Sequence, residues 1–171
     1  LTQYKSGRVG KAGFIRVTRK TAPPTGVKNW YRDEAQSGGV VFQELTKDLR
    51  WMLSVFGEPN RIFAQRSTIT TRDFFDYALV TLRFPKDPIA QLVASWAQAE
   101  GARTTIEICG DAGMLQFDSA DRAIEFQSRV KRNNPTEQPD AIDWNALENA
   151  PDLNSLETEM RAIDIAEKVA K

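Results

Sequence analysis

Residues 37–59 read SGGVVFQELTKDLRWMLSVFGEP, and this stretch decides the fold. Its large apolar residues recur at spacings of three and four, the period of a helix with one buried side. Gly57 and Pro59 follow the pattern and end it, because glycine tolerates a left-handed cap and proline cannot continue a helix. The pattern predicts a helix over Gly39–Phe56. Its buried side is expected to consist of Val41, Leu45, Leu49, Met52 and Phe56.

The opposite side of this predicted helix is polar and carries Gln43, Lys47, Arg50 and Ser54. Side chains three and four residues apart lie above one another on a helix, so these four share one face. Such a face is most often a solvated surface. It also suits the wall of a ligand cleft, and both interpretations stay open at this point.

The rest of the chain is rich in β-branched and aromatic residues, which favour strands. Strands are expected at 13–20, 61–68, 76–84, 89–96, 104–109, 114–118 and 123–127. Most connections between them are short, and short connections join antiparallel neighbours. We therefore predict an α+β fold, a mostly antiparallel, open-faced sheet with helices packed on one face. Large apolar residues also alternate onto the uncovered face, which predicts a partner domain or a second copy there.

The connections differ in character. A proline-rich loop is expected at 21–29 and a short polar connection at 30–36. Residues 131–151 are polar with several prolines, which predicts an extended arm, and Asn154 and Glu157 have capping-box spacing before a closing helix in 152–171. The apolar side of that helix is expected to be Leu156, Met160, Ile163 and Ala170.

Composition limits the chemistry. The chain has 171 residues, which suits a single domain over 1–171, and it has no histidine and one cysteine, Cys109. We therefore expect no disulfide and no metal site. Basic and acidic residues number 23 each and no apolar run reaches membrane-helix length, so neither nucleic acid nor a membrane is an expected partner. Cys109 lies in a strand-like run, where a packed core thiol is expected and a reactive thiol is the alternative.

Taken in order, several segments resemble the C-terminal domain of the glucose–fructose oxidoreductase and inositol dehydrogenase (Gfo/Idh/MocA-type) family. The similarity covers nearly the whole chain. No single motif is decisive, so the resemblance depends on several segments that occur in the same order as in the family. The segments are the first strand at 10–19, the approach to the active-site helix at 30–33 and 37–41, its continuation at 48–59, a hairpin at 106–115 and the last helix at 157–170.

The resemblance implies half of a two-domain enzyme. Family members join an N-terminal Rossmann domain, which holds NAD or NADP on a glycine-rich turn, to a domain like this one. The chain has no G-x-G-x-x-G, so we expect residues 1–10 to be the tail of a missing cofactor domain and the fragment alone to bind no cofactor. The family's reaction moves a hydride between nicotinamide and a sugar or polyol carbon, while a base takes the hydroxyl proton.

The resemblance also marks departures on the active-site helix. Typical members carry an Asp and, one turn later, a His, and these positions fall on Gln43 and Lys47. Gln43 cannot ionise, and a lysine acts as a base only where its surroundings favour the neutral amine, as a nearby cation such as Arg50 does. Lys47 is therefore the candidate catalytic base, and Gln43 and Arg50 are candidate substrate-binding residues.

Trp30, Tyr31 and Arg32 are further candidates for substrate binding. An aromatic ring packs on the C–H groups of a sugar, and a guanidinium binds its hydroxyls. The alternative is an aromatic anchor beneath a loop. Arg16 and Arg19, on the first expected strand, are weaker candidates for the same pocket.

Three functions remain in competition. The first is the substrate-binding domain of an NAD(P)-dependent oxidoreductase acting on a sugar, polyol or related hydroxy compound. The second is a non-catalytic pseudoenzyme domain that binds a sugar or mediates oligomerisation, and the third is a structural module that forms a homo-oligomer through the open sheet face. The chain begins without Met or a signal-like segment, so we expect a piece of a longer, cytoplasmic protein whose targeting segment, if it has one, lies upstream.

Overall fold

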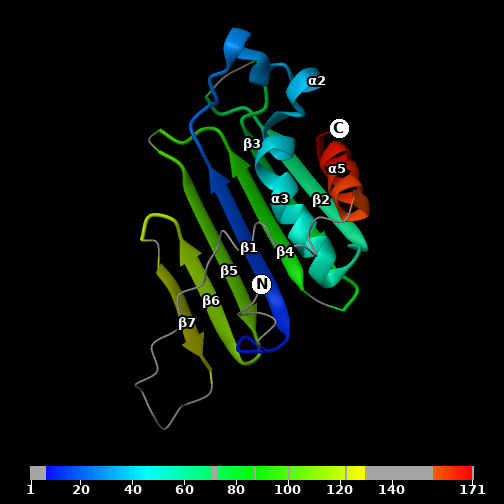
Figure 1. The fold of residues 1–171 in the computed structure, drawn as a ribbon, viewed down its shortest axis with the longest axis vertical. Coiled ribbons are helices and arrows are strands. Elements are labelled where there is room, and N and C mark those ends of the chain that lie inside the picture. The colour runs from blue at the N-terminus through cyan, green and yellow to red at the C-terminus, as the bar shows by residue number, and fades with distance from the viewer. Residues whose placement is uncertain are drawn as a thin grey trace.

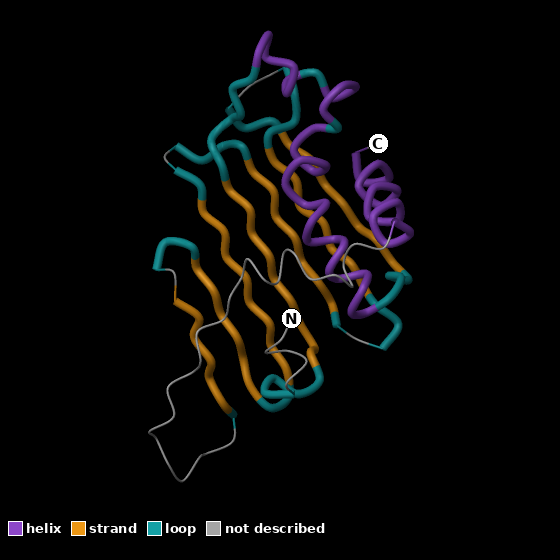
Figure 2. Tube along the Cα trace, in the orientation of Figure 1, coloured by secondary structure: helices purple, strands orange, loops and turns teal. Residues whose placement is uncertain are grey.

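The described residues form a seven-stranded sheet with helices on one face (Figures 1 and 2). The computed structural model describes residues 7–70, 73–86, 88–99, 101–121, 123–129 and 156–170. The predicted α+β fold with a mostly antiparallel, open-faced sheet is confirmed. Within these residues, no helix is both long enough and apolar enough to cross a bilayer.

The strands are arranged in the order β2-β3-β4-β1-β5-β6-β7. Every neighbouring pair is antiparallel except β1 and β4, which are parallel. Parallel neighbours need a crossover, and the segment between β1 and β4 supplies it by adding a helix and two strands on one side of β1. The strands are β1 Ala12–Lys20, β2 Arg61–Ser67, β3 Tyr77–Arg83, β4 Ile89–Ser95, β5 Arg103–Gly110, β6 Gly113–Asp118 and β7 Ala123–Ser128.

Helix α3, Gly39–Phe56, has the bounds and the buried side that its sequence predicts. It lies on the sheet over β4, β3 and β1. Its apolar residues pack into the core, and the Phe56 ring tilts against the ring of Phe84 at a centroid distance of 5.5 Å. The fully buried members of the stripe are Val41, Leu45, Leu49 and Met52.

Helix α5, Leu156–Ala170, packs against α3 and β2, and its predicted apolar side was wrong at Met160. Ile163 is half-buried, and the side chains of Leu156 and Ala170 lie outside the described residues. Met160 is 63% exposed, and the residues that are buried are Ala162, Ile165, Ala166 and Val169. Two alanines on this side leave room for α5 to approach α3 closely, so the small residues turn inward and the flexible methionine turns outward. The predicted arm at 131–151 and Asn154 of the predicted capping pair lie outside the described residues.

The connection at 30–36 is more structured than the sequence suggested. It overlaps the end of the 3-10 turn η1, Val27–Arg32, and most of the short helix α2, Glu34–Ser37. The Asp33 carboxylate caps α2 by accepting a hydrogen bond from the backbone of Ala35 at 3.0 Å. Gly38 then ends α2 and begins α3 at a φ of 74°, a backbone conformation that favours glycine. Elements this short carry no periodicity, so hydrophobic patterning could not predict them.

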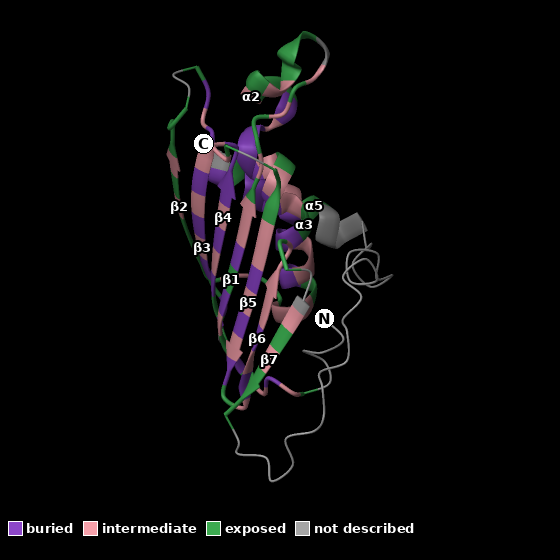
Figure 3. Cartoon of the chain, turned by 90° about the vertical axis from the view of Figure 1, so that its left-hand side faces the viewer, coloured by how far each residue is buried: buried purple, intermediate pink, exposed green. Residues whose placement is uncertain are grey.

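The other face of the sheet is covered by none of the described helices, as the turned view in Figure 3 shows. Because side chains alternate along a strand, Ile15 and Val17 point into the core while Phe14, Arg16 and Thr18 point to this open face. Cys109 is half-buried here and not in the core as expected. Burial, followed by the hydrogen bond and charge of Glu107, raises the pKa of the Cys109 thiol, which disfavours the reactive thiolate.

Candidate functional site

The turn between α2 and α3 is held by the side chain of Ser37. Its buried hydroxyl donates to the carbonyl of Tyr31 and accepts from the backbone N–H of Gly39, both at 3.0 Å. One hydroxyl therefore connects η1 to the first turn of α3. This connection fixes where α3 starts on the sheet, and with it the position of every side chain on the outer side of the helix.

Gln43 also contacts this turn. Its side-chain amide Nε2 donates to the backbone carbonyl of Ser37 at 2.6 Å, so it satisfies a carbonyl left over at the end of α2. Gln43 is nevertheless exposed, and its Oε1 is the atom still able to meet a ligand. The residue thus has a structural contact in place before any substrate role is considered.

Lys47 and Arg50 follow on the same outer side of α3, one turn further along the helix. Lys47 is exposed and Arg50 is half-buried. We define the candidate site as the outer side of α3 formed by Gln43, Lys47 and Arg50. It presents an amide, an ammonium and a guanidinium, a set that can donate hydrogen bonds to hydroxyl or anionic oxygens and can move a proton through the lysine.

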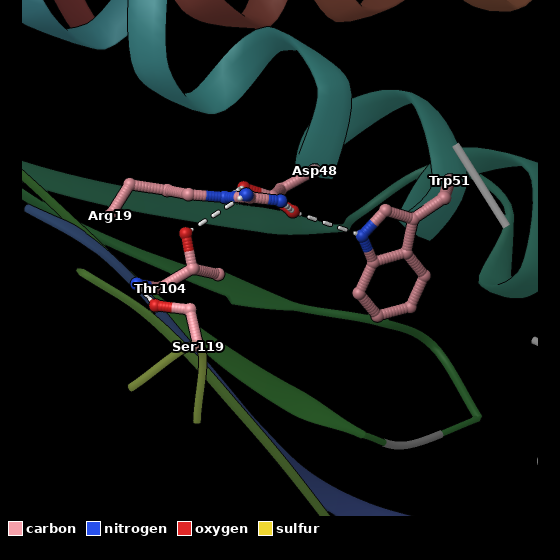
Figure 4. Close-up of polar contacts among 5 residues, drawn as sticks. All are labelled: Arg19, Asp48, Trp51, Thr104 and Ser119. Atoms are coloured by element: carbon pink, nitrogen blue, oxygen red, sulfur yellow. Dashed lines mark hydrogen bonds and ion pairs between the residues drawn. The ribbon is translucent and has the colours of Figure 1, made fainter. Parts of the chain in front are cut away.

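The inner side of α3 carries a buried ion pair that the sequence did not reveal as such (Figure 4). Asp48 is fully buried, and both of its carboxylate oxygens accept hydrogen bonds at 2.9 Å from the guanidinium of Arg19 on β1. Trp51 Nε1 donates to the same carboxylate at 3.2 Å. On the sheet side, Arg19 donates to the Thr104 hydroxyl at 3.2 Å.

This pair joins helix α3 to two strands. A bidentate contact between guanidinium and carboxylate has one favourable orientation, so it fixes the rotation of α3 as well as its distance from the sheet. Thr104 is held in turn, because its backbone N–H donates to the Ser119 hydroxyl at 2.9 Å (Figure 4). The sequence indicated that Asp48 needs a partner, since Asp48 lies within the apolar stripe and a buried carboxylate requires one, but it did not indicate that the partner is Arg19.

The two weaker pocket candidates on β1 are not part of the candidate site. Arg19 is directed to Asp48 beneath α3. Arg16 is exposed on the open face, where its guanidinium donates to Gln91 at 3.2 Å. The sheet separates Arg16 from α3, because alternate residues of β1 face opposite sides.

The aromatic candidates form a separate group at the end of the molecule where α3 begins (Figure 1). The rings of Trp30 and Tyr31 stack at a centroid distance of 4.0 Å, and Trp30 keeps 37% of its surface exposed. The Arg32 guanidinium lies 5.9 Å from the ring centroid of Phe74, so it contacts a neighbouring loop. The structure therefore brings Gln43, Lys47 and Arg50 together and places η1 beside the N-terminal end of that helix.

A second buried carboxylate, Asp76, supports the loops near this end. Its oxygens accept hydrogen bonds from the backbone N–H of Ile69 at 2.7 Å and from the N–H and hydroxyl of Thr70. Burial alone would raise the pKa of Asp76, but these hydrogen bonds outweigh it and hold the pKa below its ordinary value of 3.8. In the described part of the chain, no three potential metal ligands are grouped closely enough to hold a metal ion.

Comparison with known families identifies one match. A model of the GFO/IDH/MocA C-terminal domain matches residues 3–116. Among curated proteins, none matches the sequence.

Solved structures share the fold at low sequence identity. A protein assigned as an oxidoreductase from Thermotoga maritima superposes over 98% of this chain and 54% of its own, with a TM-score of 0.76 and 14% identity. The UDP-N-acetylglucosamine 3-dehydrogenase GnnA from Acidithiobacillus ferrooxidans matches over 99% of this chain and 56% of its own, with a TM-score of 0.68 and 17% identity.

A third similar structure was determined with ligands. The WlbA dehydrogenase from Bordetella pertussis, in complex with NADH and UDP-GlcNAcA, matches over 77% of this chain and 42% of its own, with a TM-score of 0.64 and 15% identity. At such identities the likeness concerns the fold. The chain spans about half the length of the structures that it matches.

Proposed function

The chain belongs to the family of GFO/IDH/MocA C-terminal domains, and on that premise we propose that it is the substrate-binding domain of an NAD(P)-dependent oxidoreductase. The proposed substrate is a sugar, a polyol or a related hydroxy compound. The observation that carries the proposal is the outer side of α3, where Gln43, Lys47 and Arg50 project from a helix whose inner side is fixed by the pair of Asp48 and Arg19.

The donor set on α3 fits the substrate end of such a reaction. An amide, an ammonium and a guanidinium suit hydroxyl groups, and the stacked rings of Trp30 and Tyr31 offer an apolar surface nearby. The chain has no glycine-rich dinucleotide motif, so we assign the nicotinamide cofactor to a separate domain of the intact protein. When bound, NAD or NADP exchanges a hydride with the substrate carbon.

In the proposed mechanism, the residues of this chain orient the substrate and move one proton. Lys47 accepts the hydroxyl proton through Nζ when the alcohol is oxidised, and returns it in the reverse direction. Arg50, one turn further on, binds a neighbouring oxygen of the substrate, and the free Oε1 of Gln43 accepts a hydrogen bond from a second hydroxyl. Positioned proton transfer of this kind contributes roughly 10²–10⁴-fold to a rate.

The test uses the intact protein. Binding of NAD and NADP is measured first by calorimetry, followed by turnover with a panel of sugar nucleotides, free sugars and polyols. Lys47→Ala and Lys47→Arg are expected to lower kcat by at least about 10²-fold while the cofactor affinity stays the same. Lys168→Ala on α5, an exposed lysine that pairs with Asp164, is the matched control and should keep full turnover. Failure to bind either cofactor would refute the proposal.

The alternative function is a non-catalytic domain that binds a sugar. It is favoured by the contact of Gln43 with the Ser37 carbonyl, because a side chain that serves the fold in place of the family Asp needs no catalytic role. In that case both Lys47 variants keep whatever activity the intact protein has, and the binding of sugar is unchanged.

We further propose that the open sheet face meets a second copy of the chain. The side chains exposed on it include Phe63, 58% exposed, and Ile89, 37% exposed. Exposed apolar groups of this size on a sheet face favour a protein partner.

A further inference from the structure

Glu44 lies on α3 at the border of the outer side, and its side chain is half-buried. Lys47 is three residues further along, so the two side chains are neighbours on the helix surface. Two donors hold one end of the Glu44 carboxylate. The indole Nε1 of Trp96 donates to Oε1 at 2.9 Å, and the hydroxyl of Thr21 donates to the same oxygen at 3.2 Å. The residues that follow β4 and β1 therefore fix Glu44 beside the candidate site.

The second oxygen of the Glu44 carboxylate, Oε2, is open. Within the described residues it has no hydrogen-bond or ion-pair partner, because both donors to Glu44 use Oε1. It is also not enclosed, since it is absent from the buried side-chain atoms of these residues that lack a hydrogen-bond partner. A carboxylate oxygen in this state can accept a hydrogen bond from a molecule that arrives from outside.

The open oxygen distinguishes Glu44 from the other carboxylates that the described part of the chain buries fully or in part. In each of those, both oxygens accept hydrogen bonds. They are Glu34, Asp48, Asp76, Glu107 and Asp118. A carboxylate that serves only the fold has its acceptors filled in this way, because an unfilled acceptor away from bulk water is costly. The half-filled carboxylate of Glu44, next to Lys47, therefore indicates a role toward a ligand.

We infer that Glu44 is a substrate-binding residue whose Oε2 accepts a hydrogen bond from a hydroxyl group of the substrate, and that it thereby selects a hydroxylated compound over the matching deoxy compound. The inference rests on the proposed function and adds a residue and a preference to its site. An ionised carboxylate accepts hydrogen bonds and donates none, so a hydroxyl satisfies it and a C–H group in the same place does not. Lys47 and Arg50 supply donors, and Glu44 supplies the acceptor that orients a hydroxyl.

Trp96 provides a reporter for the open oxygen of Glu44. Its side chain is 1% exposed, so a ligand in the site does not touch it. Its Nε1–H donates to Oε1 of the same carboxylate, and hydrogen bonds that share a group polarise one another. The nuclear magnetic resonance signal of this indole N–H should therefore shift when a hydroxyl binds Oε2, and its loss in Trp96→Phe assigns it.

The test titrates the intact protein with D-glucose, myo-inositol, xylitol and UDP-N-acetylglucosamine, each with and without NAD, and follows the Trp96 indole signal. At least one of these probes should shift it. Glu44→Gln keeps an oxygen for Trp96 and Thr21 but places an NH₂ donor where Oε2 was. The Kd of the probe should then rise at least about tenfold, the loss expected for a hydrogen bond to a charged group. Glu167→Gln, an exposed change on α5, is the control and should leave the Kd unchanged.

Two further measurements separate substrate binding from a structural role. With a probe that is turned over, Glu44→Gln should raise KM by the same factor while kcat changes less than about threefold, because the contact exists before the reaction begins. Among the monodeoxy analogues of the probe, one should bind the wild type at least about tenfold more weakly than the parent compound. That analogue should bind Glu44→Gln and the wild type equally, because the two changes remove the same hydrogen bond.

Three outcomes overturn the inference: a Trp96 signal that none of the probes shifts, an equal Kd in the wild type and Glu44→Gln, and deoxy analogues whose losses all add in full to that of Glu44→Gln. Circular dichroism checks that the variant is folded. Glu44→Asp, which keeps the charge but draws it back from the ligand, takes its place if it is not. The titrations without NAD need no nicotinamide, so an intact protein that binds neither cofactor refutes the proposed oxidoreductase and leaves this test in place. Nicotinamide turnover with an unchanged KM in Glu44→Gln refutes the role of Glu44 alone.

Discussion

The two sides of helix α3 differ in character: the inner side is buried in the core, and the outer side is polar and mostly exposed. The inner side combines a continuous apolar stripe with one buried ion pair, and its buried apolar residues belong to the hydrophobic core. The outer side presents Gln43, Lys47 and Arg50, none of which is needed to fill the core. The inner side therefore resists substitution in the folded chain, whereas the outer side can change its chemistry without disturbing the packing of the core. Gln43 and Lys47, the positions at which the resemblance implies an Asp and a His, lie on the outer side.

The largest effect is expected when the ion pair beneath α3 is broken. Asp48→Ala leaves the Arg19 guanidinium half-enclosed without its carboxylate, and removing one partner of a buried pair costs about 3–5 kcal/mol. Urea unfolding followed by circular dichroism measures the loss. Ser54→Ala, on the exposed side of the same helix, is the control and should change stability by less than about 0.5 kcal/mol. If Asp48→Ala and Ser54→Ala lowered the free energy of unfolding equally, the proposed difference between the inner and outer sides of α3 would be wrong.

A slightly smaller loss is expected from the apolar stripe itself. Leu49→Ala removes a fully buried side chain over the sheet, and the transfer and cavity terms together cost about 3 kcal/mol. The urea midpoint should fall while the slope m stays constant, because the surface exposed on unfolding hardly changes. A loss of less than about 1 kcal/mol in the free energy of unfolding would mean that α5 and the sheet move together and fill the cavity that the Leu49 side chain leaves.

The stripe was predictable and the ion pair was not, for a physical reason. The spacing of Leu45, Leu49 and Met52 is a local property of the sequence, and the period of the helix converts it directly into a buried side. The pairing of Asp48 with Arg19 depends on which strand lies under the helix, and the parallel contact of β1 with β4 is set by the whole topology. The local pattern also misassigned α5, where Met160 is exposed and the alanines are buried, because only the close approach of α3 distinguishes the two sides.

Part of the candidate site could likewise be predicted from local spacing, and part of it could not. Helical spacing alone placed Gln43, Lys47 and Arg50 on one face, and the structure brings them together. The role of Ser37 and the contact of Gln43 with its carbonyl required the turn between α2 and α3, which hydrophobic periodicity cannot describe. Arg16 and Arg19 are three residues apart, so the alternation of a strand places them on opposite faces, but their sequence could not show which face lies under α3.

Asp76 differs from Asp48, the buried carboxylate beneath α3, because neutral hydrogen-bond donors stabilise it instead of an arginine. Asp76→Asn should cost about 2 kcal/mol at neutral pH, since an amide cannot accept hydrogen bonds from Ile69 and Thr70 on both of its ends. The folded-state pKa of Asp76 lies below its ordinary value, so its stabilisation is complete above the unfolded-state pKa and is lost as pH falls through the folded one.

The measurement for Asp76 is the difference in thermal stability between the wild type and Asp76→Asn as pH is lowered from 7. That difference should stay constant down to about pH 4 and then shrink, because only the wild type loses a stabilising charge. A difference that is independent of pH down to the acid unfolding of both proteins would show that the carboxylate makes no such contribution.

The smallest effect on stability is expected at the centre of the outer side. Lys47→Ala removes an exposed side chain from a helix and replaces it with the best helix former, so the free energy of unfolding should change by less than about 0.5 kcal/mol. The same change is expected to abolish most of the turnover of the intact protein, and this separation of stability from activity is what distinguishes a site residue from a structural one. A loss of stability comparable to that of Leu49→Ala would place Lys47 among the residues that hold the helix in position, and the outer side would then no longer be free to vary.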